Sequence, residues 1–259
     1  MKSSIQQSAE LLFQAQQTGK TIHLISEQFT DLTTQDAYQI QDINIQRSGQ
    51  SVIGYKLGYT SAAMREQMKI SEPNYGTLLR SQWIDAATEP AQLSIEELIH
   101  PLVEPEIAFL IGKDIRSHIS EINEIQSYVS AVMPALEVVD TRYHNYQFTL
   151  IDNIADSSSS ARFITGQPMH LSKLISLAEV SVDLSCSDKH LASGLAADCM
   201  GNPLHALIWL SNRLIAQGDY LKADQIIMTG GLTKAQATHK GDLFKAEFKH
   251  LGDVQLKFV

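Results

Sequence analysis

The sequence predicts an α+β protein built around a curved, mostly antiparallel sheet. From about residue 52 onward, short apolar runs rich in β-branched and aromatic residues alternate with Gly and Pro, as is typical of strands. The residues before them have helical spacing instead. With 259 residues, 44% of them apolar, the chain can bury a large core. We therefore expect an N-terminal helical cap over residues 1–50 and a β-rich body over residues 51–259, joined in a single structural unit.

Two helices are predicted in the cap. The first places four apolar side chains at helical spacing, Ile5, Ala9, Leu12 and Phe13, before Gly19. The second begins at Thr33 or Thr34 as N-cap and ends at Gly49, since short polar side chains cap helix starts and glycine follows helix ends.

The body contains several strand-like runs. They occupy residues 51–60, 102–112, 133–140, 180–186, 224–231 and 242–259. The last run alternates with period two and predicts an antiparallel pair around a turn at residues 250–253. Three helices interleave: one capped by Thr60 or Ser61, one with a capping box of Ser94 and Glu97, and one from Pro203 to a stop at Gly218.

Composition excludes several function classes. The formal net charge is −9 and the basic residues are scattered, which argues against nucleic-acid binding. We find neither a signal-peptide core nor the roughly 18 apolar residues of a membrane span, so we expect a cytoplasmic protein without a membrane partner. Cys186 and Cys199 are in neither CxxC nor metal-site spacing, and we expect two buried or idle thiols.

Two glutamates in a strand-like run are the first candidate site residues. Glu104 and Glu106 are two apart, so in a strand their side chains point to the same face, which continues with Ala108 and Leu110. The two carboxylates thus lie at the border of a core. Pro105 between them lacks an N–H and is expected at a sheet edge or strand start, where a cleft opens.

A third glutamate, Glu137, lies in the apolar run at residues 133–140. Each carboxylate could instead lie on a solvated strand end, or Glu137 could pair with Arg142. Buried carboxylates must be neutral, paired or metal-bound, and oxygen ligands without interleaved His or Cys favour a hard cation such as Mg²⁺ or Mn²⁺. The residues alone leave these alternatives open.

Seven segments occur in the order of a known family. They are "GYKLG", "PNYGTLL", "VEPEIAF", "ALEVVDTR", "DNIADSSSS", "CMGNPLHALIWL" and "IIMTGG". From about residue 35 to the end, the chain resembles the 2-keto-4-pentenoate hydratase and 4-oxalocrotonate decarboxylase group of the fumarylacetoacetate hydrolase superfamily. The resemblance implies a fumarylacetoacetase C-terminal-like mixed β-sandwich roll with flanking helices.

The resemblance also assigns roles. It implies that Glu104, Glu106 and Glu137 bind Mg²⁺ or Mn²⁺, with positions left open for a 2-oxo acid. Lys56 then meets the substrate and moves a proton, and Ser159 contacts the substrate with Asp156 orienting it. Three carboxylates and an anionic substrate exceed the charge of one divalent cation, so an ammonium such as Lys56 is also expected on charge grounds.

Asn74 departs from the family pattern. Many members carry an aspartate with an acid/base role at this catalytic position, and asparagine cannot be a general base. Either water or another side chain takes the acid/base role, or the chain catalyses a related reaction that does not need the aspartate.

We therefore expect a hydratase that adds water to a 2-oxo or 2-hydroxy dienoic acid and forms a 4-hydroxy-2-oxo acid. Alternatives are a 2-oxo-3-hexenedioate decarboxylase and a degenerate, non-catalytic subunit. The resemblance implies a homo-oligomer, either alone or in a complex with a pathway partner enzyme. The serine run at residues 157–160 lacks a nucleophile elbow, "TGGLT" at residues 229–233 lacks nucleotide-binding spacing, and a hydrolase-type pair of His23 and Glu27 is disfavoured.

Overall fold

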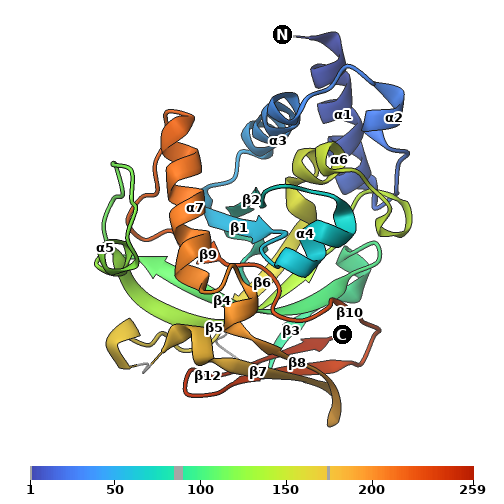
Figure 1. The fold of residues 1–259 in the computed structure, drawn as a ribbon. Coiled ribbons are helices and arrows are strands. Elements are labelled where there is room, and N and C mark those ends of the chain that lie inside the picture. The colour runs from blue at the N-terminus through green and yellow to red at the C-terminus, as the bar shows by residue number, and fades with distance from the viewer. Residues whose placement is uncertain (1, 85–89, 174–175) are drawn as a thin grey trace.

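Two β-sheets with helices packed around them form the structure, a computed structural model that describes residues 2–84, 90–173 and 176–259 (Figure 1). The helices are α1 (Ser3–Thr18), α2 (Ile25–Gln28), α3 (Thr34–Ser48), α4 (Ala62–Met68), α5 (Ile122–Gln126), α6 (Leu150–Ala155) and α7 (Pro203–Ala216). The strands are β1 (Val52–Gly58), β2 (Asn74–Leu79), β3 (Ala91–Leu93), β4 (Leu102–Ile111), β5 (Val129–Val139), β6 (Ser160–Thr165), β7 (Ser181–Cys186), β8 (Lys189–Leu195), β9 (Ile226–Met228), β10 (Gln236–Ala237), β11 (Leu243–Phe248) and β12 (Gly252–Phe258).

The first sheet is strongly curled. Its strand order is β2-β1-β9-β4-β5-β6, with β10 paired to the start of β4, and only β1 and β9 run parallel. The two ends of this order meet, because β2 contacts β6 and Trp83 bridges to Phe163. The sheet therefore has an inner face that is enclosed like the inside of a barrel.

The inner face has an apolar half. Alternate residues of five strands fill it, and all are at most 5% exposed: Leu78, Ala108, Met133, Ala135, Phe163, Ile226 and Met228. Glu104 and Glu106 lie on the same face as Ala108, so the carboxylates occupy one end of the enclosure and apolar side chains the other. The predicted common face of β4 is confirmed.

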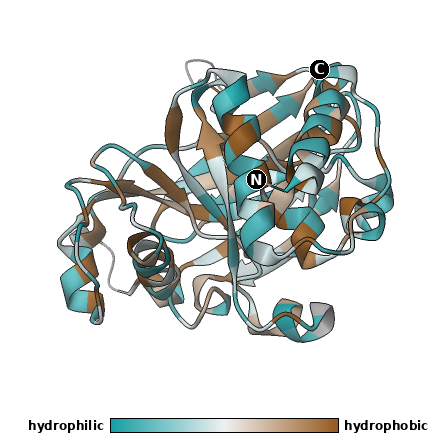
Figure 2. Ribbon diagram, turned by 90° about the horizontal axis from the view of Figure 1, so that it is seen from above, coloured by the Kyte–Doolittle hydropathy of each residue, from teal (hydrophilic) through white to brown (hydrophobic). Residues whose placement is uncertain are grey.

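The second sheet has the order β3-β12-β11-β7-β8 and packs against the outer face of β5 and β6. The expected C-terminal pair is present as β11 and β12, and the inward residues of both strands, from Phe244 to Phe258, are buried. The predicted α+β class with a curved, mostly antiparallel sheet is thus confirmed. In Figure 2, apolar segments follow the strands and the inner sides of the helices, while the loops are largely hydrophilic.

The N-terminal helices form as expected. Thr33 caps α3 in a capping box with Asp36, and Gly19 and Gly49 end α1 and α3 in left-handed conformations. Two other expectations need correction. Residues 95–97 form one 3-10 turn, and the side chain of Ser94 makes no capping hydrogen bond, because the run is too short for a regular helix. Ser61 precedes α4 but likewise makes no side-chain cap.

The cap is joined to the body by buried polar contacts. The Gln41 amide of α3 donates to the carbonyl of Ile154 at 2.8 Å and accepts from the Thr77 N–H at 3.1 Å. Ser26 of α2 donates to Asp152 of α6 through both its N–H and its hydroxyl. Apolar residues of the first forty positions belong to the same core as the sheets, which favours the predicted single unit.

Pro105 does not lie at a sheet edge, contrary to expectation. Strand β4 is internal, but β9 pairs only with Ala108 to Leu110, so the part of β4 around Pro105 faces the segment that leaves β9. The carbonyl of Pro105 accepts from the N–H of Leu232 on that side at 2.9 Å. The proline nitrogen, which points the same way, therefore removes no bond from the β4–β5 ladder.

Candidate metal centre

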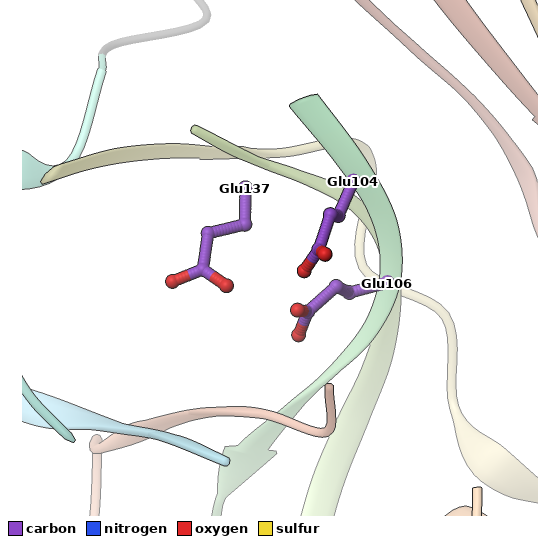
Figure 3. A group of neighbouring side chains, drawn as sticks. All are labelled: Glu104, Glu106 and Glu137. Carbon is purple, nitrogen blue, oxygen red and sulfur yellow. The ribbon is translucent and has the colours of Figure 1, made fainter. Parts of the chain in front are cut away.

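The three predicted glutamates converge. Glu104 and Glu137 are directly opposite each other in the β4–β5 ladder, and Glu106 follows on the same face. One carboxylate oxygen from each lies within 4.8 Å of those of the other two. Figure 3 shows all three carboxylates pointing into one space, Glu104 and Glu106 from one strand and Glu137 from its neighbour. The alternation of the pleat thus produces the cluster predicted from the sequence.

Several carboxylate oxygens of the cluster lack hydrogen-bond donors. Glu106 and Glu137 are fully buried, and Oε1 of each accepts no hydrogen bond. Oε2 of Glu106 accepts from the N–H of Gly230 at 2.8 Å. Because unsatisfied buried carboxylates are costly, these oxygens need a cation or protons.

Lys56 supplies one nearby positive charge. Its Nζ lies 3.1 Å from Oε2 of Glu137 and donates to the carbonyl of Ser158 at 3.0 Å. Burial lowers the pKa of this amine, but the three glutamates raise it by more, so the net shift is upward. Lys56 therefore stays protonated. The alternative pairing of Glu137 with Arg142 is wrong, because Arg142 pairs with Asp156.

One ammonium does not neutralise three carboxylates. Desolvation, reinforced by Glu137 and partly offset by Lys56, raises the pKa of Glu104 to about 7. Desolvation, followed by repulsion from Glu137, raises the pKa of Glu106 well above its usual value. Without a metal the cluster therefore holds protons near neutral pH.

This donor set fits a hard divalent cation. It offers three carboxylates, one of which, Glu104, lines a cavity, and buried oxygens of Glu106 and Glu137 lack hydrogen-bond donors. No His or Cys belongs to the described cluster. Oxygen ligands of this kind suit Mg²⁺ or Mn²⁺. Bound metal would replace the protons on Glu104 and Glu106.

A cavity reaches the cluster at Glu104, whereas Glu106 and Glu137 are buried behind its lining. Polar groups line part of it, among them Lys56, Tyr59, Thr60, Glu104, Asn153, Ser158 and Ser159. Apolar groups line the rest: Met64, Leu102, Val139, Phe148 and Ala235. Among the described residues of this lining, Lys56 is the only lysine or arginine.

Ser159 reaches the cavity as predicted, but its hydroxyl has a different partner. It accepts from Nδ2 of Asn153 at 3.2 Å. The Asp156 carboxylate instead accepts from the side chain and N–H of Arg142 and from the hydroxyl of Thr141, and it lines a separate cavity. The structure thus places Asp156 behind the site and gives its carboxylate no contact with the hydroxyl it was expected to orient.

Asn74 lies one layer below the cavity lining. Its Nδ2 donates to Oδ1 of Asn153 at 2.8 Å, and its Oδ1 accepts from the hydroxyl of Ser158 at 3.2 Å. It is opposite Gly58 in the β1–β2 ladder, and a Cβ on Gly58 would lie 2.3 Å from the Asn74 amide oxygen. The glycine of the lysine motif therefore leaves room for this network.

The serine run adopts an unusual backbone. Ser157, Ser158 and Ser159 have φ values of 50°, 52° and 59°, a left-handed conformation that costs energy for residues other than glycine. This turn directs the Ser158 carbonyl toward Lys56 and the Ser159 hydroxyl into the cavity. The run is thus both a turn and part of the wall of the cavity.

Several residues of the site were not predicted. Asn153 and Ser158 were part of the family-like segment "DNIADSSSS", but only a folded helix–turn shows that their side chains meet Asn74. Gly230 was taken only as a turn residue. His23, expected to be an improbable lid residue, is exposed and packs against His144.

Comparisons with known proteins agree with this site. Residues 52–259 match the family model for the C-terminal domain of fumarylacetoacetate (FAA) hydrolase. The chain is 34% identical over 257 residues to a 2-keto-4-pentenoate hydratase of Paraburkholderia xenovorans, covering 98% of this chain and 94% of that one. It is 32% identical over 254 residues to a 4-oxalocrotonate decarboxylase of Pseudomonas putida, covering 97% and 95%.

A solved structure is similar over the whole chain. The 4-oxalocrotonate decarboxylase of Pseudomonas putida G7, complexed with magnesium and adipate, superposes with a TM-score of 0.92 at 29% identity and covers 100% of this chain and 98% of its own. None of the described helices is long and apolar enough to cross a membrane.

Proposed function

Because the chain belongs to the fumarylacetoacetate hydrolase family, we propose that it is a divalent-metal-dependent hydratase of a 2-oxo or 2-hydroxy dienoic acid, of the 2-keto-4-pentenoate type. The product is a 4-hydroxy-2-oxo acid. The observation that carries this proposal is the cluster of Glu104, Glu106 and Glu137 beside Lys56. Relatives of both the hydratase and the decarboxylase kind support an enzymatic, lyase-type function.

A cation bound by the three carboxylates supplies Lewis-acid polarisation of a 2-oxo group. The protein supplies the remaining interactions. Lys56 stays protonated, so its ammonium can pair with the substrate carboxylate or donate a proton to the reacting chain. Burial raises the pKa of Tyr59 to about 12, so this phenol stays neutral and can donate a hydrogen bond in the cavity.

The proposed binding of substrate by Ser159 rests on the network beneath it. Asn153 donates to the Ser159 hydroxyl, which leaves the hydroxyl hydrogen free to point into the cavity. Asn74 holds Asn153 and Ser158 in place, and we assign it a positioning role. Asp156 would act more remotely, by holding Arg142 and thereby the turn that ends in Ser159.

Decarboxylation of 2-oxo-3-hexenedioate is the second candidate, because decarboxylases are also among the relatives and the solved neighbour is a 4-oxalocrotonate decarboxylase complexed with magnesium and adipate. Incubation with 2-hydroxypenta-2,4-dienoate and, separately, with 2-oxo-3-hexenedioate distinguishes the two. We expect loss of dienoate absorbance without CO₂ from the first acid. Release of CO₂ from the second acid, without dienoate hydration, would show the decarboxylase.

The metal site is tested by Glu106→Gln. The change keeps the side-chain shape but removes one anionic ligand, and we expect Mn²⁺ affinity measured by calorimetry to fall at least about tenfold. Hydratase activity should fall with it. Glu96→Gln is the control, because Glu96 is exposed and pairs only with Lys240 on the surface. A Glu106→Gln variant with parental Mn²⁺ affinity and activity would disprove the proposed metal site.

A further inference from the structure

A tight turn connects the strand of Lys56 to helix α4. Strand β1 ends at Gly58 and α4 begins at Ala62, and the three residues between them, 59–61, all line the cavity (Figure 1). Tyr59 has a φ of 57°, a left-handed conformation that residues other than glycine adopt at an energetic cost. Such a conformation persists where neighbouring groups hold it.

Arg65 of α4 holds this turn. Its Nη1 donates to the carbonyl of Tyr59 and to that of Thr60, both at 2.8 Å. Consecutive carbonyls of an extended strand point to opposite sides, so these two converge on one nitrogen because the chain turns at Tyr59. Arg65 is half-buried, and its guanidinium thus serves the backbone of the cavity wall.

The two carbonyls differ in how far they depend on Arg65. The Thr60 carbonyl also accepts from the Met200 N–H at 3.3 Å, and Thr60 is buried against Gly230, where an added Cβ would lie 2.4 Å from the threonine hydroxyl oxygen. The donor that the structure gives to the Tyr59 carbonyl is Arg65. Loss of the guanidinium should therefore release Tyr59 more than Thr60.

The Tyr59 side chain lies in the cavity near the charged groups of the proposed site. After burial, the charges that shift the pKa of its phenol are those of Lys56, which lowers it, and of Glu104, which raises it. All three side chains line the same cavity. The phenol is therefore a hydrogen-bond donor close to where the head of a 2-oxo acid is proposed to bind.

We propose that Arg65 is a positioning residue, which holds the turn at Tyr59 so that the Tyr59 hydroxyl donates a hydrogen bond to the bound 2-oxo acid. The proposal rests on the proposed function, since it takes the acid to bind beside Glu104. Arg65 itself is not part of the described lining of the cavity, so it acts through Tyr59 and not by touching the acid.

Binding of 2-oxopentanoate, which lacks the double bonds that hydration needs, tests the proposal. By calorimetry with the Mn²⁺-loaded protein, we expect Tyr59→Phe, which removes only the hydroxyl, and Arg65→Ala each to weaken binding about tenfold. Because both changes act on one hydrogen bond, the double variant should bind no more weakly than Tyr59→Phe alone. Additive losses in the double variant, or parental affinity of either single variant, would overturn the proposal.

Arg65→Lys offers a shorter donor to the same carbonyls and should recover part of the affinity that Arg65→Ala loses. In the Tyr59→Phe background the same exchange should change nothing. A gain in that background, or no gain in the parental one, would also overturn the proposal. If Arg65→Ala does not fold, Arg65→Lys and Tyr59→Phe are compared by the same cycle. Arg47→Ala is the matched control and should bind as the parent does, because Arg47 pairs with Glu10 on the cap.

Failure of this proposal differs from failure of the proposed function. If the Mn²⁺-loaded parent binds 2-oxopentanoate and the variants bind it equally well, the metal-held acid stands and the role of Arg65 and Tyr59 fails. If the parent does not bind the acid in the presence of Mn²⁺, the proposed function fails, and the proposal that rests on it fails as well.

Discussion

At the scale of single residues, proton binding and metal binding compete for the same carboxylates. The pKa of Glu104 is raised from its usual 4.5 to about 7, and that of Glu106 is raised further above its usual range. The metal-free fold therefore holds more protons than the unfolded chain above about pH 4.5. Its stability should fall as the pH rises through this range, because the folded protein must then release protons or bury charge.

This gives a prediction for metal stabilisation. We expect the increase in melting temperature on adding Mn²⁺ to be larger at pH 8 than at pH 5.5, because at the lower pH protons already neutralise the carboxylates. Differential scanning calorimetry at constant free Mn²⁺ measures it. A Glu104→Gln variant, which lacks one titrating carboxylate, should show a weaker dependence; an increase that is the same at both pH values in the parent would contradict the prediction.

Asn74 leads to a second pH prediction. Its amide donates to Asn153 and accepts from Ser158, and a protonated aspartic acid could make the same two bonds. An ionised one would place its oxygen against Oδ1 of Asn153.

We therefore expect the ratio of the activity of Asn74→Asp to that of the parent to be highest at low pH and to fall as the pH rises and the new carboxyl group ionises. Hydratase rates of both proteins between pH 5.5 and 9 measure the ratio. Asn74→Ala separates the loss of the two hydrogen bonds from the titration and should give a ratio that is low at every pH. A constant ratio for Asn74→Asp would show that the network tolerates a carboxylate.

A site residue could be identified from the sequence when its position depends only on the strand in which it lies. Glu104 and Glu106 share a face through the strand period alone, and the same period places Glu137 opposite Glu104 once β4 and β5 pair. The partner of Ser159 could not be obtained in this way. It depends on how α6 and the left-handed turn are oriented, which brings Asn153 rather than Asp156 to the hydroxyl.

At the scale of elements, three loops cross behind the glutamates. The segment after β9 donates the Gly230 N–H to Glu106, and the preceding Thr229 carbonyl accepts from the Cys199 thiol at 3.2 Å. Ser61, after β1, bridges to Cys199. Burial raises the pKa of this thiol to about 12, so it stays a neutral donor.

We expect Cys199→Ala to weaken Mn²⁺ binding about tenfold, because removal of the donor frees the peptide that holds Glu106. Cys199→Ser, which keeps a donor, should recover part of the affinity. Calorimetric titration measures both, and Cys186→Ala is the matched control, since Cys186 lies on β7 of the other sheet. Equal affinities of Cys199→Ala and Cys186→Ala would show that the thiol has no part in the metal site.

Elements were predicted where their own periodicity was strong. The helices from Ser3 and Pro203 and the pair β11–β12 have clear apolar patterns and end signals, and all three form. Strand β8 has mostly polar or small residues, and β2 follows Pro73 and contains Gly76, so neither stands out from a loop in sequence. They are strands because β8 pairs with β7 and β2 pairs with β1.

At the scale of the whole molecule, the cap and the body share buried contacts. The apolar side chains of α1 and α3 belong to the same core as the sheets, and Ser26 and Gln41 connect α2 and α3 to α6 and β2. We therefore propose that residues 2–50 and the body form a single structural unit.

We expect the chain to unfold in one cooperative step. Both tryptophans, Trp83 and Trp209, lie outside the cap, whereas far-UV circular dichroism also reports on its helices. The urea transitions followed by fluorescence and by circular dichroism should therefore coincide. Ser26→Ala should shift both midpoints together, with a loss of about 1 kcal/mol. Separate transitions would show that residues 1–50 form an independent domain.

The interior of the curled sheet, apolar at one end and carboxylate-lined at the other, also limits how substrate and product reach and leave the proposed site. Apolar side chains fill the described interior beyond Glu106, and the cavity approaches the carboxylate cluster from the other side, at Glu104. We expect product to leave through the same cavity by which substrate enters. Product and substrate cannot occupy this cavity together. We therefore expect accumulating product to inhibit the proposed reaction competitively with substrate.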